Sequence, residues 1–229
     1  MSSKRKPASH RSNGREVAPP IDAYFTIAAP VQTEYKIQGS KFISLLEPLS
    51  SAEEFFRFID TARKEFHDAT HHCYAYRLGI TGEEKRSNDD GEPTGTAGKR
   101  ILSALEDRQL TFLALIVVRY FGGTKLGIGG LSHAYSAASA LAIEHAEIIE
   151  RFVTEIVIVD FSSELLGIVH REIDRCGGRI THQEYLDTHR YHVELRLSVS
   201  ERFMQALQDF SHNKISCTRE SAAKTSQVS

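Results

Sequence analysis

The sequence has few of the features that define several common protein classes. It contains only three cysteines in 229 residues, Cys73, Cys176 and Cys217, and no two of them lie close together. This spacing argues against a disulfide framework and against a cysteine-rich zinc site. No run approaches the roughly 18–20 apolar residues of a membrane helix, and the N-terminus lacks an apolar signal core. We therefore expect a cytoplasmic protein that does not enter a membrane.

An excess of basic charge is also missing where the chain is expected to fold. Hydrophobic residues make up 41% and charged residues 25%, which suits a globular protein. Residues 1–20 carry a net charge of +4, but residues 21–150 hold 13 basic and 18 acidic side chains, and residues 151–220 hold 9 and 11. Neither part has the basic excess of a typical nucleic-acid-binding domain, so a site for a polyanion would have to be local.

Hydrophobic patterning divides the chain into two folded parts between two tails. Residues 1–20 and 221–229 are polar and have no hydrophobic periodicity, which predicts disordered tails, the first of them basic. Residues 21–149 and 150–220 contain the apolar periodic segments, and we predict one domain in each.

The first domain is predicted to mix strands and helices. A hairpin turns at residues 38–40, and a helix begins at Ser50 or Ser51 and continues to about Phe66. Residues 111–120 are apolar nearly throughout, which is typical of a buried strand. We further expect a strand at 71–80, a long loop at 81–98, a short helix at 99–107, and a helix from residue 128 or 130 to about 147.

The second domain shows a simpler order. Strands are expected at 152–161, 179–187, 190–199 and 214–220, with helices at 164–178 and 200–210, the second opened by Ser200 as N-cap. This β-α-β-β-α-β order is that of a ferredoxin-like sandwich.

A glycine-rich stretch, GGTKLGIGG, connects the buried strand at 111–120 to the next helix. Its glycines are Gly122, Gly123, Gly127, Gly129 and Gly130, with Arg119 and Lys125 beside them. Free backbone N–H groups at a helix N-terminus attract anions, and glycine lets a phosphate approach the backbone closely. The stretch matches neither a P-loop nor a dinucleotide fingerprint. An alternative to which we give equal weight is that these glycines only permit tight turns and close packing.

A second glycine-rich stretch precedes the short helix. Here Gly95, Thr96, Gly98 and Lys99 follow Asp89, Asp90 and Glu92. Again the P-loop pattern fails, and Thr94 or Thr96 is a candidate N-cap. The three carboxylates are candidates for a hard cation or for acid–base chemistry. We favour a polar turn in which an Asp caps the chain.

Histidines and a cysteine cluster at the start of the strand at 71–80. His71 and His72 are adjacent, so on a strand their side chains point to opposite faces and cannot readily share a metal ion. Cys73 beside a histidine is a candidate nucleophile, although a buried, unreactive thiol is the interpretation we favour. The sequence contains neither G-x-S-x-G nor H-E-x-x-H. We expect no bound metal and no cofactor.

Four stretches together resemble one protein family. They are GSKFI at 39–43, HDATHHCYAYRLG at 67–79, RSNDDGEPTGTAGKRIL at 86–102 and VVRYFGGTKLGIGGLSHAYSAA at 117–138. In this order they are similar to the motifs of the IMPACT family, in its bacterial, YigZ-like two-domain form. One residue departs from the family pattern: Arg100 stands where proline usually follows GTAGK.

The resemblance implies a fold and, less directly, a function. It implies an α+β protein whose first domain is similar to the second domain of ribosomal protein S5. Its second domain would be ferredoxin-like and similar to the last domain of elongation factor G. Because eukaryotic relatives regulate translation, the resemblance suggests a binding protein that engages RNA, the ribosome or a translation factor.

Three functions follow as hypotheses. The first is a binding protein whose anion site combines Lys99, Arg119, Lys125 and the five glycines, with His71, His72, Asp89, Asp90, Glu92 and Thr96 on the same surface. The second is an enzyme acting on a small phosphorylated or peptide substrate through the carboxylates at 89–92. The third is a protein-interaction module without an anion site. We rank the enzyme lower, because the sequence shows no complete nucleophile–base–orienter set.

Overall fold

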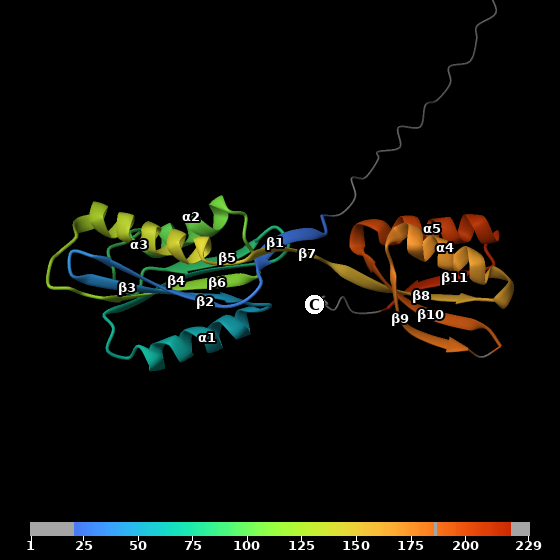
Figure 1. Ribbon diagram of the computed structural model, residues 1–229, viewed down its shortest axis with the longest axis horizontal. Helices are drawn as coiled ribbons and strands as arrows, with labels where there is room; N and C mark the ends of the chain where they lie inside the picture. The colour runs from blue at the N-terminus through green and yellow to red at the C-terminus, as the bar shows by residue number, and fades with distance from the viewer. Residues whose placement is uncertain (1–20, 186, 221–229) are drawn as a thin grey trace, which may run out of the picture.

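The computed structural model describes residues 21–185 and 187–220; the predicted tails at 1–20 and 221–229 lie outside these residues. Its strands pair antiparallel in three sheets, and five α-helices pack on them (Figure 1). The chain is therefore an α+β protein, as the sequence predicts.

The first unit is a five-stranded sheet with helices on both faces. Its strand order is β2-β3-β6-β4-β5. Helices α2 and α3 cover one face and α1 covers the other (Figure 1). The elements are β2 (Val31–Ile37), β3 (Ser40–Pro48), α1 (Ala52–Glu65), β4 (His71–Leu78), β5 (Glu84–Asn88), α2 (Gly98–Asp107), β6 (Leu113–Tyr120) and α3 (Gly127–Glu144).

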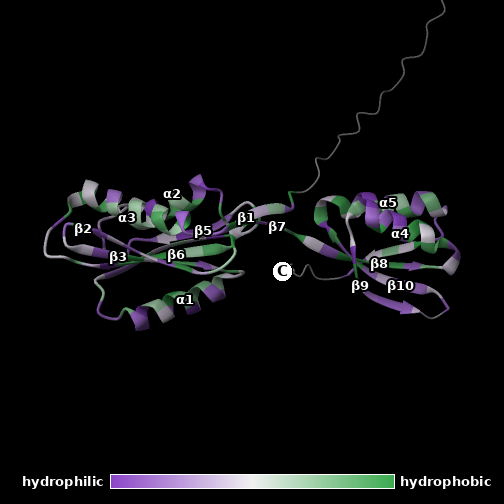
Figure 2. Ribbon diagram, viewed as in Figure 1, coloured by the Kyte–Doolittle hydropathy of each residue, from purple (hydrophilic) through white to green (hydrophobic). Residues whose placement is uncertain are grey.

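Burial on both faces explains why the central strands are apolar throughout. Successive residues of a strand face opposite sides, so one strand supplies two cores. In β6, Leu115 and Val117 pack under α2 and α3, whereas Ile116 and Val118 pack on α1. Figure 2 shows the matching pattern: the central strand β6 is coloured mainly hydrophobic, the edge strand β5 is hydrophilic, and α1 alternates between hydrophobic and hydrophilic residues.

Helix α1 begins where the sequence predicts. Ser51 is its N-cap, and the Oγ atom of Ser51 accepts a hydrogen bond from the Glu54 N–H at 3.3 Å. The Glu54 carboxylate in turn accepts from the Ser50 N–H at 2.7 Å. The first bond satisfies an N–H group that the helix itself leaves unpaired, and the second holds the residue before the N-cap against the first turn.

Three strands depart from the expectations. Residues 84–88 were expected to be loop but form β5, an edge strand paired with β4, and β1 (Ala23–Ile27) and β7 (Ile148–Phe152) pair with each other as a separate ribbon. Edge strands carry little hydrophobic alternation, and the β1–β7 pairing joins the two ends of the first unit. Neither feature leaves a local pattern in the sequence.

The second unit follows the predicted order of elements. Its strand order is β11-β8-β10-β9, with α4 and α5 on the same face (Figure 1). Gly177 ends α4 in the left-handed conformation, φ 63°, as expected of a glycine C-cap. The elements are β8 (Thr154–Phe161), α4 (Leu166–Cys176) after a 3₁₀ turn (Ser163–Leu165), β9 (Arg179–Tyr185), β10 (His189–Arg196), α5 (Leu197–Ser211) and β11 (Ser216–Arg219).

The prediction that Ser200 caps α5 was wrong. The helix begins at Leu197, and its N-cap is Arg196. Ser200 is buried inside the first turn, where its Oγ donates to the Leu197 carbonyl at 3.1 Å. A serine within a helix can satisfy its hydroxyl against the preceding turn, so a serine alone does not mark the helix start.

The two units meet at Asp22, which lies just before the β1–β7 ribbon. Its carboxylate accepts from Arg196 Nη2 at 3.1 Å and from the Ser198 N–H at 2.9 Å, and its backbone carbonyl accepts from the Val153 N–H. The Arg196 guanidinium also stacks 3.7 Å from the centroid of the Phe152 ring. Asp22 thereby fixes the start of α5 against the end of the ribbon.

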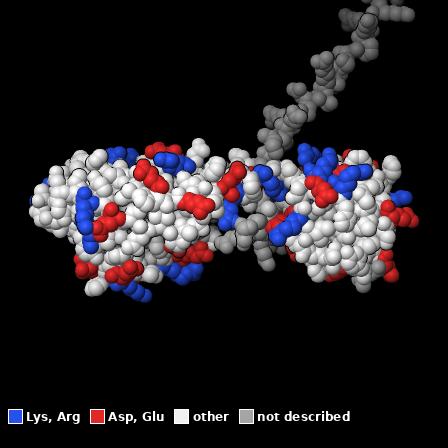
Figure 3. Space-filling model, in the orientation of Figure 1, with Lys and Arg blue, Asp and Glu red and all other residues white. Residues whose placement is uncertain are grey.

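The surface carries both signs of charge. Figure 3 shows the charged side chains of one face scattered in small groups among large uncharged areas. On this face the distribution agrees with the balanced composition and leaves only local patches for a polyanion. Among the described residues no helix is long and apolar enough to cross a membrane.

We predict that Asp22→Asn lowers the free energy of unfolding by about 1–3 kcal/mol at neutral pH, because two hydrogen bonds to a carboxylate are weakened. Burial opposes ionisation of Asp22, but the hydrogen bonds from Ser198 and Arg196 outweigh it and hold its pKa below the ordinary 3.8. A lowered pKa stabilises the fold above the ordinary value, and this contribution disappears as the pH falls through the folded pKa. Denaturant unfolding at pH 7 and pH 3 tests this, since the two proteins should differ less at pH 3.

Candidate functional site

Four separate loops meet at one end of the five-stranded sheet. Ser40 Oγ accepts from the Gly122 N–H at 3.3 Å, and Thr70 Oγ1 accepts from the Phe121 N–H at 3.2 Å. His71 Nδ1 lies 2.8 Å from the Asp90 carbonyl. The start of β3, the start of β4, the loop after β5 and the loop after β6 are therefore one site.

A buried ion pair lies at the centre of this site. Arg119 Nη1 donates to Glu92 Oε1 at 2.7 Å, and their side chains are only 6% and 3% exposed. The Tyr135 hydroxyl of α3 donates to the same Glu92 oxygen at 2.8 Å. A buried charge is tolerated only when it is paired and hydrogen-bonded. Here Arg119 and Glu92 neutralise each other, and Tyr135 adds a hydrogen bond to Glu92. We call Arg119, Glu92, Tyr135, His71 and Cys73 the buried network.

The expectation that Arg119 is a surface contact for phosphate was therefore wrong in its placement. The Arg119 side chain follows the alternation of β6 and points under α3, into the buried network. The position of Arg119 next to the glycine-rich stretch does not show that its side chain is buried, because its ion-pair partner Glu92 lies 27 residues earlier in the chain.

His71 and His72 point to opposite faces of the sheet, as predicted. His71 belongs to the buried network, with its Nε2 3.8 Å from Glu92 Oε1. Because the Asp90 carbonyl can only accept, His71 Nδ1 carries a hydrogen, and in the neutral ring Nε2 keeps its lone pair. His72 Nε2 lies 3.2 Å from the Phe66 carbonyl, and burial lowers the pKa of His72 despite the nearby Asp90 charge.

Cys73 is fully buried beneath α3. Its Sγ lies 3.0 Å from the Asp89 carbonyl and 3.3 Å from the Tyr135 hydroxyl. Burial raises the pKa of the Cys73 thiol far above its ordinary value, and burial likewise raises the pKa of Tyr135. A thiol that cannot ionise is a poor nucleophile, so the geometry favours the packing role for Cys73.

Asp89 caps the short helix α2. Its Oδ1 accepts from the Ala97 and Gly98 N–H groups at 3.0 and 2.8 Å, and its Oδ2 accepts from the Gly95 N–H at 2.8 Å. The chain thus supplies its own anion to this helix N-terminus, in agreement with the predicted polar turn capped by an Asp. Thr96 is not the cap, since its hydroxyl donates to the Pro93 carbonyl and the residue is buried.

The other residues of this loop divide between the fold and the surface. Asp90 has a positive φ of 44°, and its carboxylate accepts from the His72 N–H at 2.6 Å. Lys99 is exposed in the first turn of α2. Arg100 donates its backbone N–H to the Ala97 carbonyl at 2.9 Å, a bond that proline would lack. N–H groups in the first turn of a helix need no partner within the helix, so both arginine and the proline usual in the family are compatible with this position.

Two glycines are required by the close approach of two chain segments. A Cβ atom on Gly122 would lie 1.9 Å from the Gly39 carbonyl carbon, and one on Gly98 would lie 2.6 Å from the Asn88 nitrogen. Distances below 3.0 Å do not occur between real Cβ atoms and backbone. The packing explanation therefore holds for Gly122 and Gly98.

The remaining glycines of the stretch after β6 face open space. We call residues 121–130 the glycine corner. Gly123 and Gly127 have positive φ values of 84° and 69°, whereas Gly129 has no positive φ, and a Cβ atom placed on it would meet no atom within 4 Å. A Cβ atom on Gly130 would meet only the Leu126 side chain, at 3.1 Å. No side chain caps α3 at Leu126, and Lys125 beside it is exposed.

Sequence reasoning missed three residues of the site. Ser40 and Tyr135 are buried polar partners of Arg119 and Glu92, and Phe121 is an exposed aromatic at the glycine corner. Tyr135 lies among the apolar buried residues of α3, so its hydroxyl gave no separate indication. A tyrosine inside a core usually needs a polar partner, and that rule could have pointed to Glu92.

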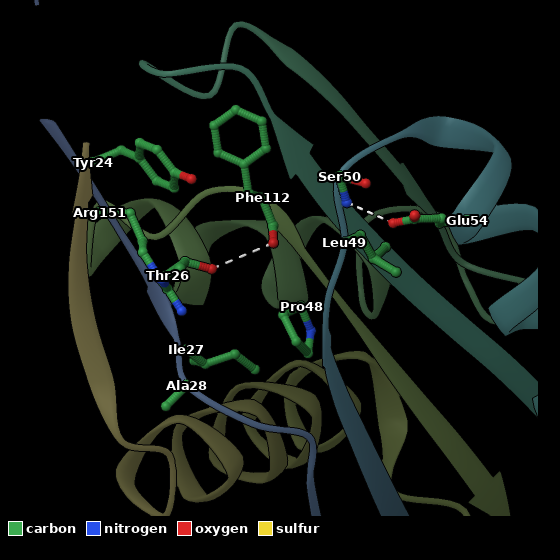
Figure 4. Close-up of a pocket in the computed structure, with 10 residues that line it drawn as sticks. All are labelled: Tyr24, Thr26, Ile27, Ala28, Pro48, Leu49, Ser50, Glu54, Phe112 and Arg151. Carbon is green, nitrogen blue, oxygen red and sulfur yellow. Dashed lines mark hydrogen bonds between the residues drawn. The ribbon is translucent and has the colours of Figure 1, made fainter. Parts of the chain in front are cut away.

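A pocket of about 330 Å³ lies away from these residues (Figure 4). Its lining includes Tyr24, Phe112 and Arg151, and its visible hydrogen bonds run from Thr26 Oγ1 to the Phe112 carbonyl and from the Ser50 N–H to Glu54. The pocket adjoins the end of β3 and the start of β6, whereas the buried network adjoins the opposite ends of the same two strands. It contains no predicted site residue.

No metal centre is found among residues 21–185 and 187–220. No group of three or more His, Cys, Asp or Glu side chains there is placed to hold an ion. The three carboxylates at 89–92 explain why: Asp89 and Asp90 bind backbone N–H groups, and Glu92 binds Arg119 and Tyr135.

Comparison with known proteins gives consistent matches. The family model of the Impact N-terminal domain matches residues 38–143. The IMPACT family member YigZ of Escherichia coli is 31% identical over 198 residues, which cover 85% of this chain and 97% of that protein. The IMPACT family member YvyE of Bacillus subtilis is 37% identical over 153 residues, 67% of this chain and 70% of that protein.

A solved structure shares the fold. The crystal structure of a hypothetical protein superposes with a TM-score of 0.62 at 29% identity, covering 86% of this chain and 97% of that one. The likeness thus extends over most of the described residues.

We predict that Arg119→Met lowers the free energy of unfolding by about 3–5 kcal/mol, because Glu92 is left as an uncompensated buried charge. The double variant Arg119→Met/Glu92→Gln should recover a large part of this loss, since the orphaned charge is removed. Urea unfolding of the single and double variants measures both. An equal loss in the double variant would show that packing, and not charge, is the main contribution of Arg119.

We predict that Cys73 in the folded protein does not react with iodoacetamide at pH 8, because burial keeps its thiol protonated. Cys176 is only partly buried and serves as the internal comparison, whereas burial also raises the pKa of the Cys217 thiol, to about 11. Mass spectrometry after timed alkylation measures the three sites, and unfolded protein should be modified at all of them. Rapid modification of Cys73 in the folded chain would reopen its role as a nucleophile.

Proposed function

This chain belongs to the IMPACT family, and from that premise we propose that it is a cytoplasmic binding protein of the translation machinery. In this proposal it contacts phosphate groups of RNA, on the ribosome or on a translation complex, through the glycine corner. The partner is recognised by a small, local anion site and not by a broad basic surface.

One contrast carries the proposal. Two helices begin after glycine-rich turns. The amides before α2 are filled by the Asp89 carboxylate, whereas no side chain among residues 21–185 and 187–220 caps α3. The fold therefore satisfies one helix N-terminus internally and leaves the other open to solvent. An oxyanion at the open one would gain the N–H donors and the favourable end of the helix dipole.

Neighbouring residues support the same assignment. Lys125 is an exposed cation beside the open helix N-terminus. Gly129 has no steric or conformational need to be glycine within the chain, although glycine in a helix costs roughly 0.5–1 kcal/mol relative to alanine. A ligand that approaches the backbone closely would account for glycine at this position.

The finer fold assignment belongs to the same proposal. We propose that residues 21–149 form a domain like the second domain of ribosomal protein S5, and that residues 150–220 form a ferredoxin-like domain like the last domain of elongation factor G. The strand order β11-β8-β10-β9 with both helices on one face, and a separate hydrophobic core in residues 157–215, support the second assignment. Likeness to ribosome-associated folds adds to the proposed link with translation only by analogy.

An enzyme is the second candidate, and one observation favours it. His71 Nε2 lies 3.8 Å from Glu92 Oε1 beside the buried Arg119, and an imidazole next to a carboxylate is a pair of groups that acid–base catalysis uses. However, Asp89 and Asp90 are committed to backbone N–H groups. A metabolite screen in which turnover is lost in Glu92→Gln, with the fold intact, would establish this candidate.

We predict that the chain pellets with ribosomes in a salt-dependent manner, and that Lys125→Gln and Gly129→Ala each weaken pelleting. Loss of one phosphate contact should reduce the slope of log affinity against log salt by about one in Lys125→Gln. Gly129→Ala should fold at least as stably as the parent, because a methyl group there meets no atom within 4 Å.

The matched control is Lys64→Gln, which removes the same charge from the exposed face of α1. It should pellet like the parent at every salt concentration. Salt-independent pelleting would indicate a protein partner in place of RNA phosphate. Absence of pelleting for the parent protein at any salt concentration would refute stable ribosome binding.

A further inference from the structure

The guanidinium of Arg119 uses only one of its edges. Arginine has five N–H donors in a planar fork. Nη1 donates to Glu92 Oε1 at 2.7 Å, on the side of the group away from the Nε–H bond. The other edge, formed by Nε–H and Nη2–H, has a single long contact, 3.4 Å from Nη2 to Ser40 Oγ. Nε is buried and has no hydrogen-bond partner among the described residues.

An unfilled donor edge on a buried cation is unusual. Buried polar atoms are nearly always hydrogen-bonded, because desolvating a donor without replacing its bond is unfavourable. The Nε–Nη2 edge matches the spacing of two oxygens on one phosphate or carboxylate group, which it binds with two parallel hydrogen bonds. The side chain of Arg119 is only 6% exposed, so this edge is held in a fixed orientation.

Two further donors lie beside the free edge. The Ser40 hydroxyl is buried next to Nη2, and the Gly122 N–H points to the Ser40 oxygen at a long 3.3 Å. The contact between Gly122 and Gly39 fixes this N–H in place. An oxyanion at the edge would therefore meet the guanidinium, a hydroxyl and a backbone amide.

Two aromatic rings, one buried and one exposed, flank the Arg119 guanidinium. The Arg119 Cζ atom lies 5.6 Å from the ring centroids of both Phe42 and Phe121. Phe42 is fully buried, but Phe121 is 47% exposed and is followed by Gly122 and Gly123. The Phe121 ring can therefore leave the stack by rotation of its side chain, whereas the Phe42 ring cannot leave the core.

We infer that the Nε–Nη2 edge of Arg119 is a binding site for one phosphate group, with Phe121 as its cover. Rotation of the Phe121 ring opens the edge, and a phosphate then receives hydrogen bonds from Arg119, from Ser40 and from the Gly122 amide. The ligand class rests on the proposed function, since RNA is one source of phosphate. A free phosphate ester is the other source, and the chemistry is the same for both.

The Nε–H signal of Arg119 in nitrogen-15 NMR spectra of the full chain tests this inference. The signal is assigned by its absence in Arg119→Lys, and it is followed during titration with inorganic phosphate and, separately, with a short single-stranded oligouridylate. We expect a saturable shift of this signal in the parent protein. In Phe121→Ala we expect at least threefold tighter binding, because the closed state no longer competes with the ligand.

The control is Phe56→Ala, which removes an equally exposed phenylalanine, 47%, from α1. It should leave the affinity for either probe unchanged. A shift with both probes identifies a general phosphate site, and a shift with the oligouridylate alone identifies an RNA backbone site. No shift with either probe in the parent and in Phe121→Ala overturns the inference, as does equal tightening in Phe56→Ala.

The two proposals can fail separately. If ribosome pelleting depends on Lys125 and Gly129 while the Arg119 signal never moves, the glycine corner binds RNA without this site. If phosphate shifts the Arg119 signal but the protein never pellets with ribosomes, the Arg119 site stands and the translation partner does not. Phe121→Ala leaves the Arg119–Glu92 pair in place, so the test does not depend on an unstable variant.

Discussion

The ion pair between Arg119 and Glu92 is the interaction on which the site depends. Two opposite charges out of contact with water are stable only if both are oriented and hydrogen-bonded, so their surroundings must be built around them. Tyr135 brings α3 to the pair, and His71 brings the start of β4. Segments that are far apart in the chain thus contact the same buried ion pair, which explains why they lie at the same end of the sheet.

A second requirement, the unpaired amides at helix starts, is met in two different ways. Before α2 the Asp89 carboxylate accepts three backbone N–H groups and holds the loop that carries Glu92. At the start of α3, no side chain of the described residues accepts the first N–H groups in this way. The N–H groups at the start of α2 therefore stabilise the fold, whereas those at the start of α3 can bind a ligand. A ligand is the natural complement to the second, because a helix N-terminus prefers an anion.

The distribution of charge limits how this protein can attract a polyanionic partner. Each folded part carries slightly more acidic than basic residues, and the charged side chains visible on one face are dispersed (Figure 3). Broad electrostatic attraction to a polyanion is therefore weak, and recognition must rely on a few well-oriented donors. Lys125, the open amides of the glycine corner and the unfilled edge of Arg119 are donors of this kind.

The sequence by itself determined the α+β class, the hairpin at 38–40, the start of α1 to within one residue (Ser50 or Ser51), and the opposite orientations of His71 and His72. Caps, turns and alternation act over only a few residues, which is why the sequence reveals them. Its motifs also resembled the family to which the chain belongs. Only the tertiary structure decided that Arg119 is buried against Glu92, that Asp89 caps α2, and that β1 pairs with β7. Each of these depends on groups brought together across the chain by packing, and burial then fixes which donors are satisfied and which remain free.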